Sequence, residues 1–171
     1  MSTESFLSSI IEVAIAIAGF AGIVAAIRHR DVTRWADGEQ ILLRMLLASS
    51  GTAVSFALLP AILFEVDLPE PAIWRAGSIS LLLWLFAAAA LRTRQLREID
   101  SAPNFPQLVP VGVVCSALLQ ILNIYLEASW PYLIGIFIIV VNGFTFFLLL
   151  LFGSTSAAAQ HDDEDRRGIA G

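Results

Sequence analysis

The chain has 171 residues, 57% of them hydrophobic, and a mean hydropathy of +0.78. Soluble domains contain about 45 to 50% apolar residues, so this composition is typical of a protein embedded in a lipid bilayer. The ten basic residues are all Arg, and with fifteen acidic residues they leave a net charge of −5, which argues against a nucleic-acid partner. We therefore predict an all-α integral membrane protein, a bundle of about five transmembrane helices.

The first apolar run, residues 6–28, is predicted to be a retained membrane span. Its leader contains Glu4 and no Lys or Arg, whereas a secretory signal requires positive charge. On a helical wheel, bulky side chains share one face and small residues share the opposite face. Small residues at every fourth position let helix backbones approach closely in lipid. We expect the other helices to pack around this span, through a helix-packing face that contains Ala14, Ala18, Gly19, Gly22 and Ala26.

Four further apolar runs are long enough to be membrane spans, at residues 41–64, 73–91, 108–126 and 132–152. A capping-box pattern that begins at Asp37 predicts a helix start ahead of the second run. Pro60 lies near the end of this run, leaves the carbonyl of Phe56 without its helical partner, and is expected to kink the helix. The membrane domain is expected to cover residues 1–153, and the polar, acidic tail at 154–171 is expected to be disordered.

The distribution of Arg residues predicts the orientation in the membrane. With five spans, alternate loops lie on the same side, and of the ten Arg residues only Arg75 falls on the side of the N-terminus. Because positive charge accumulates in cytoplasmic loops, the N-terminus is expected outside and the C-terminus in the cytoplasm. The composition suggests the inner membrane of a bacterium. The predicted cytoplasmic basic patch comprises Arg28, Arg30, Arg34, Arg92, Arg94 and Arg97.

Polar residues within the predicted spans are the candidate functional residues. At about 1.5 Å of rise per residue, Glu12 and Arg75 lie at similar depths, and we expect them to form an ion pair bordered by Gln120 and Asn123. Asn142 is a further polar position, in the last span. Two other interpretations stay open. The amides can serve only to hydrogen-bond neighbouring helices, and Glu12 can extend towards the lipid headgroups.

Residues typical of enzymes and metal sites are sparse. Cys115 is the only cysteine, so the chain forms neither an intrachain disulfide nor a cysteine metal site. His161 precedes a run of four acidic residues that can bind a divalent cation, but such runs are usually only solvated. The sequence contains no HExxH, GxSxG or glycine-rich phosphate-binding pattern. We predict no metal site, no cofactor, no enzymatic activity and no identifiable small-molecule substrate.

Three function classes remain from the sequence. The first is a homo-oligomeric channel or pore, regulated through its cytoplasmic loops or by a partner. The second is an accessory or scaffold subunit of a larger complex, which docks onto another membrane protein. The third is a carrier or an intramembrane enzyme, and it has the least support because Glu12 is its only candidate reactive group.

Overall fold

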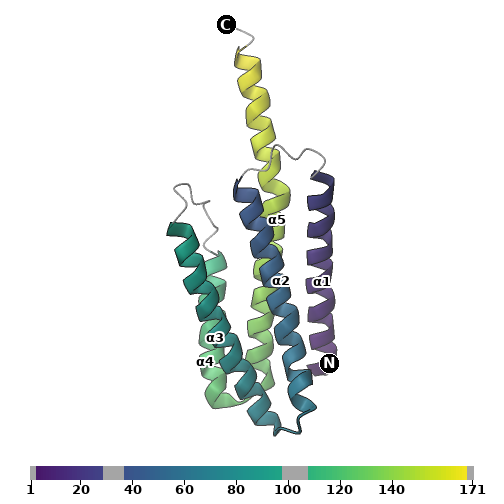
Figure 1. The fold of residues 1–171 in the computed structure, drawn as a ribbon, viewed down its shortest axis with the longest axis vertical. Coiled ribbons are helices and arrows are strands. Elements are labelled where there is room, and N and C mark those ends of the chain that lie inside the picture. The colour runs from purple at the N-terminus through teal and green to yellow at the C-terminus, as the bar shows by residue number, and fades with distance from the viewer. Residues whose placement is uncertain (1–2, 29–36, 98–107, 169–171) are drawn as a thin grey trace.

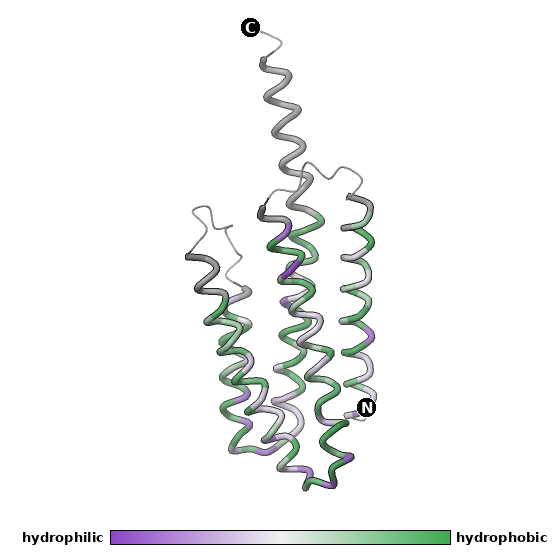
Figure 2. Tube along the Cα trace, in the orientation of Figure 1, coloured by the Kyte–Doolittle hydropathy of each residue, from purple (hydrophilic) through white to green (hydrophobic). Residues whose placement is uncertain are grey.

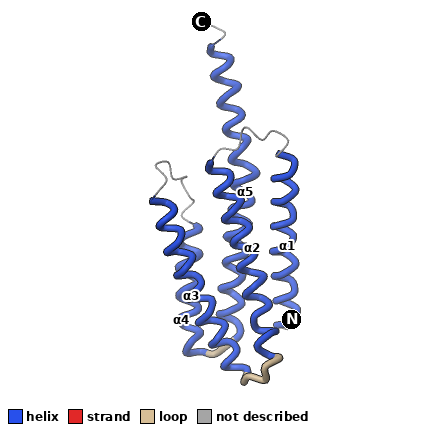
Figure 3. The backbone as a smooth tube through the Cα atoms, in the orientation of Figure 1, coloured by secondary structure: helices blue, strands red, loops and turns tan. Residues whose placement is uncertain are grey.

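The computed structural model describes residues 3–28, 37–97 and 108–168. These residues form helices joined by short turns and contain no strand (Figure 3). The five helices are α1 (Thr3–Arg28), α2 (Asp37–Phe64), α3 (Glu70–Arg97), α4 (Leu108–Leu126) and α5 (Ser129–Gly168). Four of them, α1, α2, α3 and α5, are long and apolar enough to cross a membrane. The apolar part of α4 is shorter, Pro110–Leu126.

The helices alternate in direction along the bundle (Figure 1). The N-terminus, the turn between α2 and α3 and the turn between α4 and α5 lie at one end, and α5 extends beyond the other end towards the C-terminus. Hydrophilic residues gather near the turns at the N-terminal end and again in the first turns of α2 (Figure 2). This placement of helix ends is the one that the sequence predicts from alternate loops.

The central helix is α5, not α1 as expected from the sequence. Helix α5 contacts the other four, whereas α1 contacts only α2 and α5 and lies at one edge of the bundle. In an apolar stretch of 18 residues, 44% of the residues are buried in α5 but only 28% in α1. Gly135 and Gly143 contribute to this arrangement, because they allow side chains of α4 and α2 to approach the α5 backbone closely.

Helix α2 runs unbroken through Pro60 to Phe64. The carbonyl of Phe56, which Pro60 leaves without its helical partner, accepts a hydrogen bond of 2.7 Å from the hydroxyl of Tyr132 on α5. Tyr132 is fully buried, and its ring lies 5.9 Å from the ring of Trp74. A Cβ atom at Gly77 would come within 3.0 Å of the Tyr132 ring, so the absence of a side chain at Gly77 lets α3 pack closely against this ring. Tyr132 thus joins α2, α3 and α5.

The C-terminal segment is helical where the sequence predicts disorder. Helix α5 continues as far as Gly168 and projects beyond the bundle (Figure 1). The segment includes the run 157–159, which is all Ala, the residue with the highest helix propensity. Because the segment extends an existing helix, it requires no new helix nucleus. A polar composition is therefore compatible with helix formation here.

Candidate functional site

Glu12 lies on the face of α1 that points away from the bundle. The buried residues of α1 recur at intervals of three and four and form one stripe: Leu7, Ile10, Ala14, Ile17 and Ala21. Glu12 is nine positions before Ala21, which at about 100° per residue places it half a turn from the centre of that stripe. Glu12 is exposed, and no described residue forms a hydrogen bond or ion pair with it.

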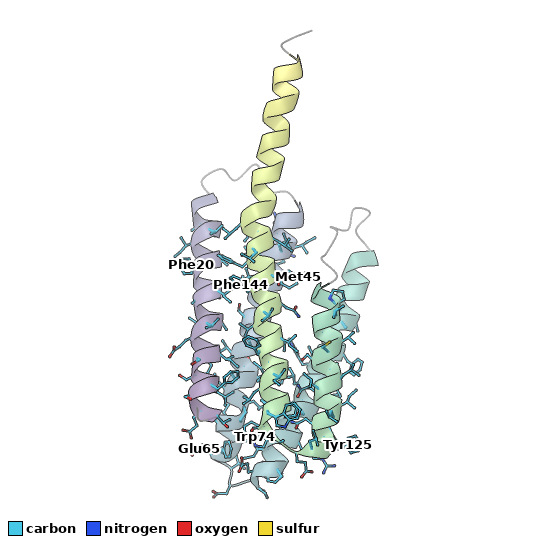
Figure 4. The ribbon with its side chains drawn as sticks, turned by 180° about the vertical axis from the view of Figure 1, so that it is seen from behind. Phe20, Met45, Glu65, Trp74, Tyr125 and Phe144 are labelled. Carbon is cyan, nitrogen blue, oxygen red and sulfur yellow. The ribbon has the colours of Figure 1, made fainter. Side chains whose placement is uncertain are left out.

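The residues around Glu12 on this side of α1 are small or polar, except for Ile23. Residues within about 40° of Glu12 on the helical wheel are all exposed. Together with Glu12 they form what we call the outward face of α1: Ser5, Ser8, Glu12, Ala16, Gly19, Ile23 and Ala26. A Cβ atom built at Gly19 would meet no other atom within 4 Å, so the space above this face is open. Phe20 projects away from the bundle beside it (Figure 4).

Arg75 pairs with Glu127, so the expected Glu12–Arg75 ion pair is wrong. The Nη1 atom of Arg75 lies 3.1 Å from Oε1 of Glu127, and the two side chains are 54% and 36% exposed. Helix α3 packs beside α4, which ends next to Glu127, whereas α1 makes no contact with α3. The shared depth of Glu12 and Arg75 did not reveal that they lie on opposite edges of the bundle. The sequence analysis did not single out Glu127, which immediately follows the fourth apolar run.

Asn123 connects α3, α4 and the turn that follows α4. Its Nδ2 atom donates to Oγ of Ser78 at 2.8 Å, and its Oδ1 atom accepts from the backbone N–H of Ala128 at 3.0 Å. Asn123 and Ser78 are both fully buried. These bonds are the arrangement expected if the amide serves to join neighbouring helices and to hold the turn that enters α5.

Gln120 and Asn142 hold α4 against α5 in a reciprocal arrangement. The Nε2 atom of Gln120, on α4, donates to the carbonyl of Pro131 at 3.3 Å, and its side chain occupies the space where a Cβ atom of Gly135 would be. Asn142, on α5, is buried over Gly112 of α4, where a Cβ atom would come within 2.9 Å of its Oδ1 atom. Each amide thus packs over a glycine of the other helix.

One acceptor in this helix pair has no partner. The Oε1 atom of Gln120 is buried and accepts no hydrogen bond from the described residues. The neighbouring hydroxyl of Ser116 donates instead to the carbonyl of Gly135, at 3.2 Å. The Gln120 amide and the Ser116 hydroxyl are thus both directed at backbone carbonyls of α5, an arrangement that serves packing between the two helices.

The predicted helix-packing residues fall on different sides of α1. Ala14 is buried and Ala18 is half-buried, whereas Gly19, Gly22 and Ala26 are exposed. The bundle contacts a stripe that mixes Leu, Ile and Ala, so it uses only part of the small-residue face. A Cβ atom at Gly22 would meet nothing within 4 Å, as at Gly19.

The outward side of α2 resembles that of α1. Gly51 also has open space above it, and Ser55 is exposed one turn further on. Arg44 is exposed and has no hydrogen-bond or ion-pair partner among the described residues. The glycines of α3 and α4 differ, because a Cβ atom at Gly77 or Gly112 would meet a side chain of α5. Open glycines and unpaired charges thus occur on the α1 and α2 side.

The predicted cytoplasmic basic patch lies entirely outside the part of the chain whose side chains are described. Arg30 and Arg34 fall within residues 29–36, which lie outside the described ranges. Arg28 and Arg97 are the last residues of α1 and α3, and Arg92 and Arg94 lie in the last turns of α3. The patch stays a prediction. Among the described residues, no group of three or more His, Cys, Asp or Glu side chains is placed to hold a metal ion.

Comparison of the chain with protein-family models, with curated proteins and with solved structures gave no match.

Proposed function

We propose that this protein is a homo-oligomeric channel of the membrane, in which the outward faces of several α1 helices surround a shared aqueous pathway. The observation that carries the proposal is the position of Glu12. It is an exposed carboxylate without a described partner, half a turn from the buried stripe of a helix long enough to span a membrane.

The cost of placing a charge in lipid makes this position informative. Glu12 lies about 13 Å along α1 from Thr3, at about 1.5 Å per residue. A charged side chain near the centre of a span costs about 2.5 to 3.5 kcal/mol on insertion scales, so it normally faces protein or water. The described helices of its own copy leave Glu12 exposed. In a ring of copies with α1 innermost, Glu12 faces water instead of lipid.

The order of residues along the outward face of α1 also suits a pathway. The half of this face nearest the N-terminus is polar, with Ser5, Ser8 and Glu12. The other half is apolar, with the small residues Gly19 and Ala26 and the bulkier Ile23. A polar mouth followed by an apolar constriction is a recurrent design of channel pores. The interior amides of the bundle, by contrast, bond to neighbouring helices and backbones.

In this proposal all five helices cross the membrane, with the N-terminus outside and the C-terminus in the cytoplasm of a bacterial cell. Helix α4, with 19 residues, rises about 28 Å, close to the hydrocarbon thickness of about 30 Å. The concentration of Arg at the other end of the bundle from the N-terminus favours a cytoplasmic location for that end. Ligands or partners that act on the channel would meet the basic patch there.

The second candidate is an accessory subunit that docks onto another membrane protein. The observation that favours it is the unpaired Arg44 on α2, which lies on the same face as the open space at Gly51, about two turns away. A larger membrane protein with a carboxylate at that depth would neutralise Arg44 and fill the space.

The test combines mass and conduction on the purified protein. The mass in detergent and in lipid nanodiscs is expected to be that of a uniform ring, and liposomes that contain the protein are expected to conduct ions. For substitutions of Glu12, Glu4→Gln is the matched control, because Glu4 is also an exposed carboxylate and lies in the first turn of α1. A monomer that does not conduct contradicts the channel, and co-purification with a second membrane protein then supports the accessory subunit.

A further inference from the structure

We infer that Glu12 and Ser8 of neighbouring copies form a ring of oxygen ligands that binds small inorganic cations and makes the pathway cation-selective. This inference rests on the proposed function, because the ring is incomplete in a single copy. It adds the site and the class of ion that the pathway carries.

The geometry of α1 places the two ligands together. Ser8 lies four residues before Glu12, so the two side chains occupy the same face, one turn apart. Both are exposed, and no described residue forms a hydrogen bond with the Ser8 hydroxyl. The neighbouring Ser9 differs, because its hydroxyl donates to the carbonyl of Ser5 at 2.9 Å. Ser8 and Glu12 are thus the polar groups of this turn that remain available to a ligand.

The charges around this end of α1 favour a cation. The first 27 residues contain no basic side chain, and of their two acidic ones, Glu4 and Glu12, only Glu12 lies on the outward face. Arg75 lies at the same end of the bundle, but it belongs to α3, which α1 does not contact, and its charge is paired with Glu127. Rings of carboxylates select cations in channels, and carboxylate and hydroxyl oxygens are hard ligands that suit Na⁺, K⁺ or Ca²⁺.

Selection by charge is confined to one level of the pathway. Beyond Glu12, the outward face of α1 presents Ala16, Gly19, Ile23 and Ala26, none of which carries a charge. A ring at Ile23 can restrict the passage of water and ions but does not distinguish the sign of an ion. The preference for cations is therefore expected to depend on Glu12.

The experiment measures the cation-to-anion permeability ratio of reconstituted protein in a KCl gradient. Glu12→Gln is expected to keep the mass of the wild-type ring and to lower this ratio by about tenfold or more, the scale on which charged clefts concentrate ions. Glu12→Asp keeps the charge and is expected to retain the preference, Ser8→Ala is expected to reduce it partly, and Glu4→Gln leaves it unchanged. A wild-type ratio retained by Glu12→Gln overturns the inference.

A second measurement uses the intact wild-type protein and does not depend on variants that fold. A water-soluble carbodiimide activates a carboxylate that faces water, an added amine then forms an amide with it and releases the carbodiimide as a urea, and mass spectrometry reports the amide at Glu12. K⁺ or Na⁺ is expected to slow the reaction relative to choline at equal ionic strength, and an equal rate in all three salts contradicts a cation site. If the wild-type protein forms no conducting ring, the proposed function fails. If it conducts but Glu12→Gln changes nothing, only the cation ring fails.

Discussion

The hydroxyl of Tyr132 donates a 2.7 Å hydrogen bond to the carbonyl of Phe56, the acceptor that Pro60 leaves free in α2. This bond links the most buried helix of the bundle to the point at which α2 lacks one of its own backbone bonds. A proline that would otherwise weaken α2 is thereby compensated from α5.

The first prediction concerns this bond. Tyr132→Phe leaves the Phe56 carbonyl buried without a partner and is expected to lower the free energy of unfolding by about 1–3 kcal/mol. Pro60→Ala supplies an N–H at the position that pairs with residue 56 in a regular helix, so the cost of Tyr132→Phe is expected to be smaller in that background. The measurement is denaturant unfolding followed by Trp fluorescence. Tyr125→Phe is the control, because Tyr125 is 83% exposed and points away from the bundle (Figure 4).

The second prediction concerns the amide that packs over Gly135. Gly135→Ala forces a methyl group into the space of the Gln120 side chain and is expected to destabilise the protein by about 1–3 kcal/mol. Adding Gln120→Ala removes the obstructing atoms and is expected to recover part of this loss, measured as a double-mutant cycle of unfolding free energies. Gly51→Ala is the control, since a Cβ atom there meets nothing. If Gly135→Ala lowers the free energy of unfolding equally with and without the Gln120 side chain, the Gln120 side chain does not obstruct a methyl group at position 135.

The third prediction separates folding from conduction. Gly19→Leu places a bulky side chain in the open space on the outward face of α1 and is expected to leave the fold of each copy intact, within about 0.5 kcal/mol. In the proposed ring Gly19 lies on the face that lines the pathway, so the same side chain is expected to narrow the pathway and lower the conductance while the mass of the assembly stays unchanged. Ala87→Leu, at an exposed position of α3, is the control. An unchanged conductance for Gly19→Leu argues against a pathway lined by this face.

The fourth prediction concerns the apolar half of the pathway. Ile23 is 56% exposed and lies about 20° from Glu12 on the helical wheel. Ile23→Ser is expected to raise the conductance roughly several-fold, because a polar ring lowers the barrier to wetting at a hydrophobic constriction. Phe20→Ser is the control, since Phe20 is 61% exposed but lies about 80° from Glu12. A conductance raised equally by both substitutions contradicts a constriction at Ile23.

The sequence by itself determined the helices. The predicted run 108–126 coincides with α4, the second and third runs lie within α2 and α3, and the pattern at Asp37 coincides with the first residue of α2. The carbonyl that Pro60 frees was also evident, because it follows from the spacing of backbone bonds within one helix. These features depend on neighbouring residues along the chain, and apolar length alone indicates which segments are suited to a membrane.

Only the tertiary structure decided which helix is central, which residue pairs with Arg75 and which way Glu12 faces. In a soluble helix the apolar stripe marks the inside, but here both faces of α1 are apolar enough for lipid, so its pattern does not distinguish the buried stripe from the outward face. Depth along a span likewise does not reveal which helices are neighbours. The sequence therefore did not indicate that Arg75 pairs with Glu127 and not with Glu12. The packing of α5 against all four other helices leaves α1 at the edge, with its carboxylate facing away from its own bundle.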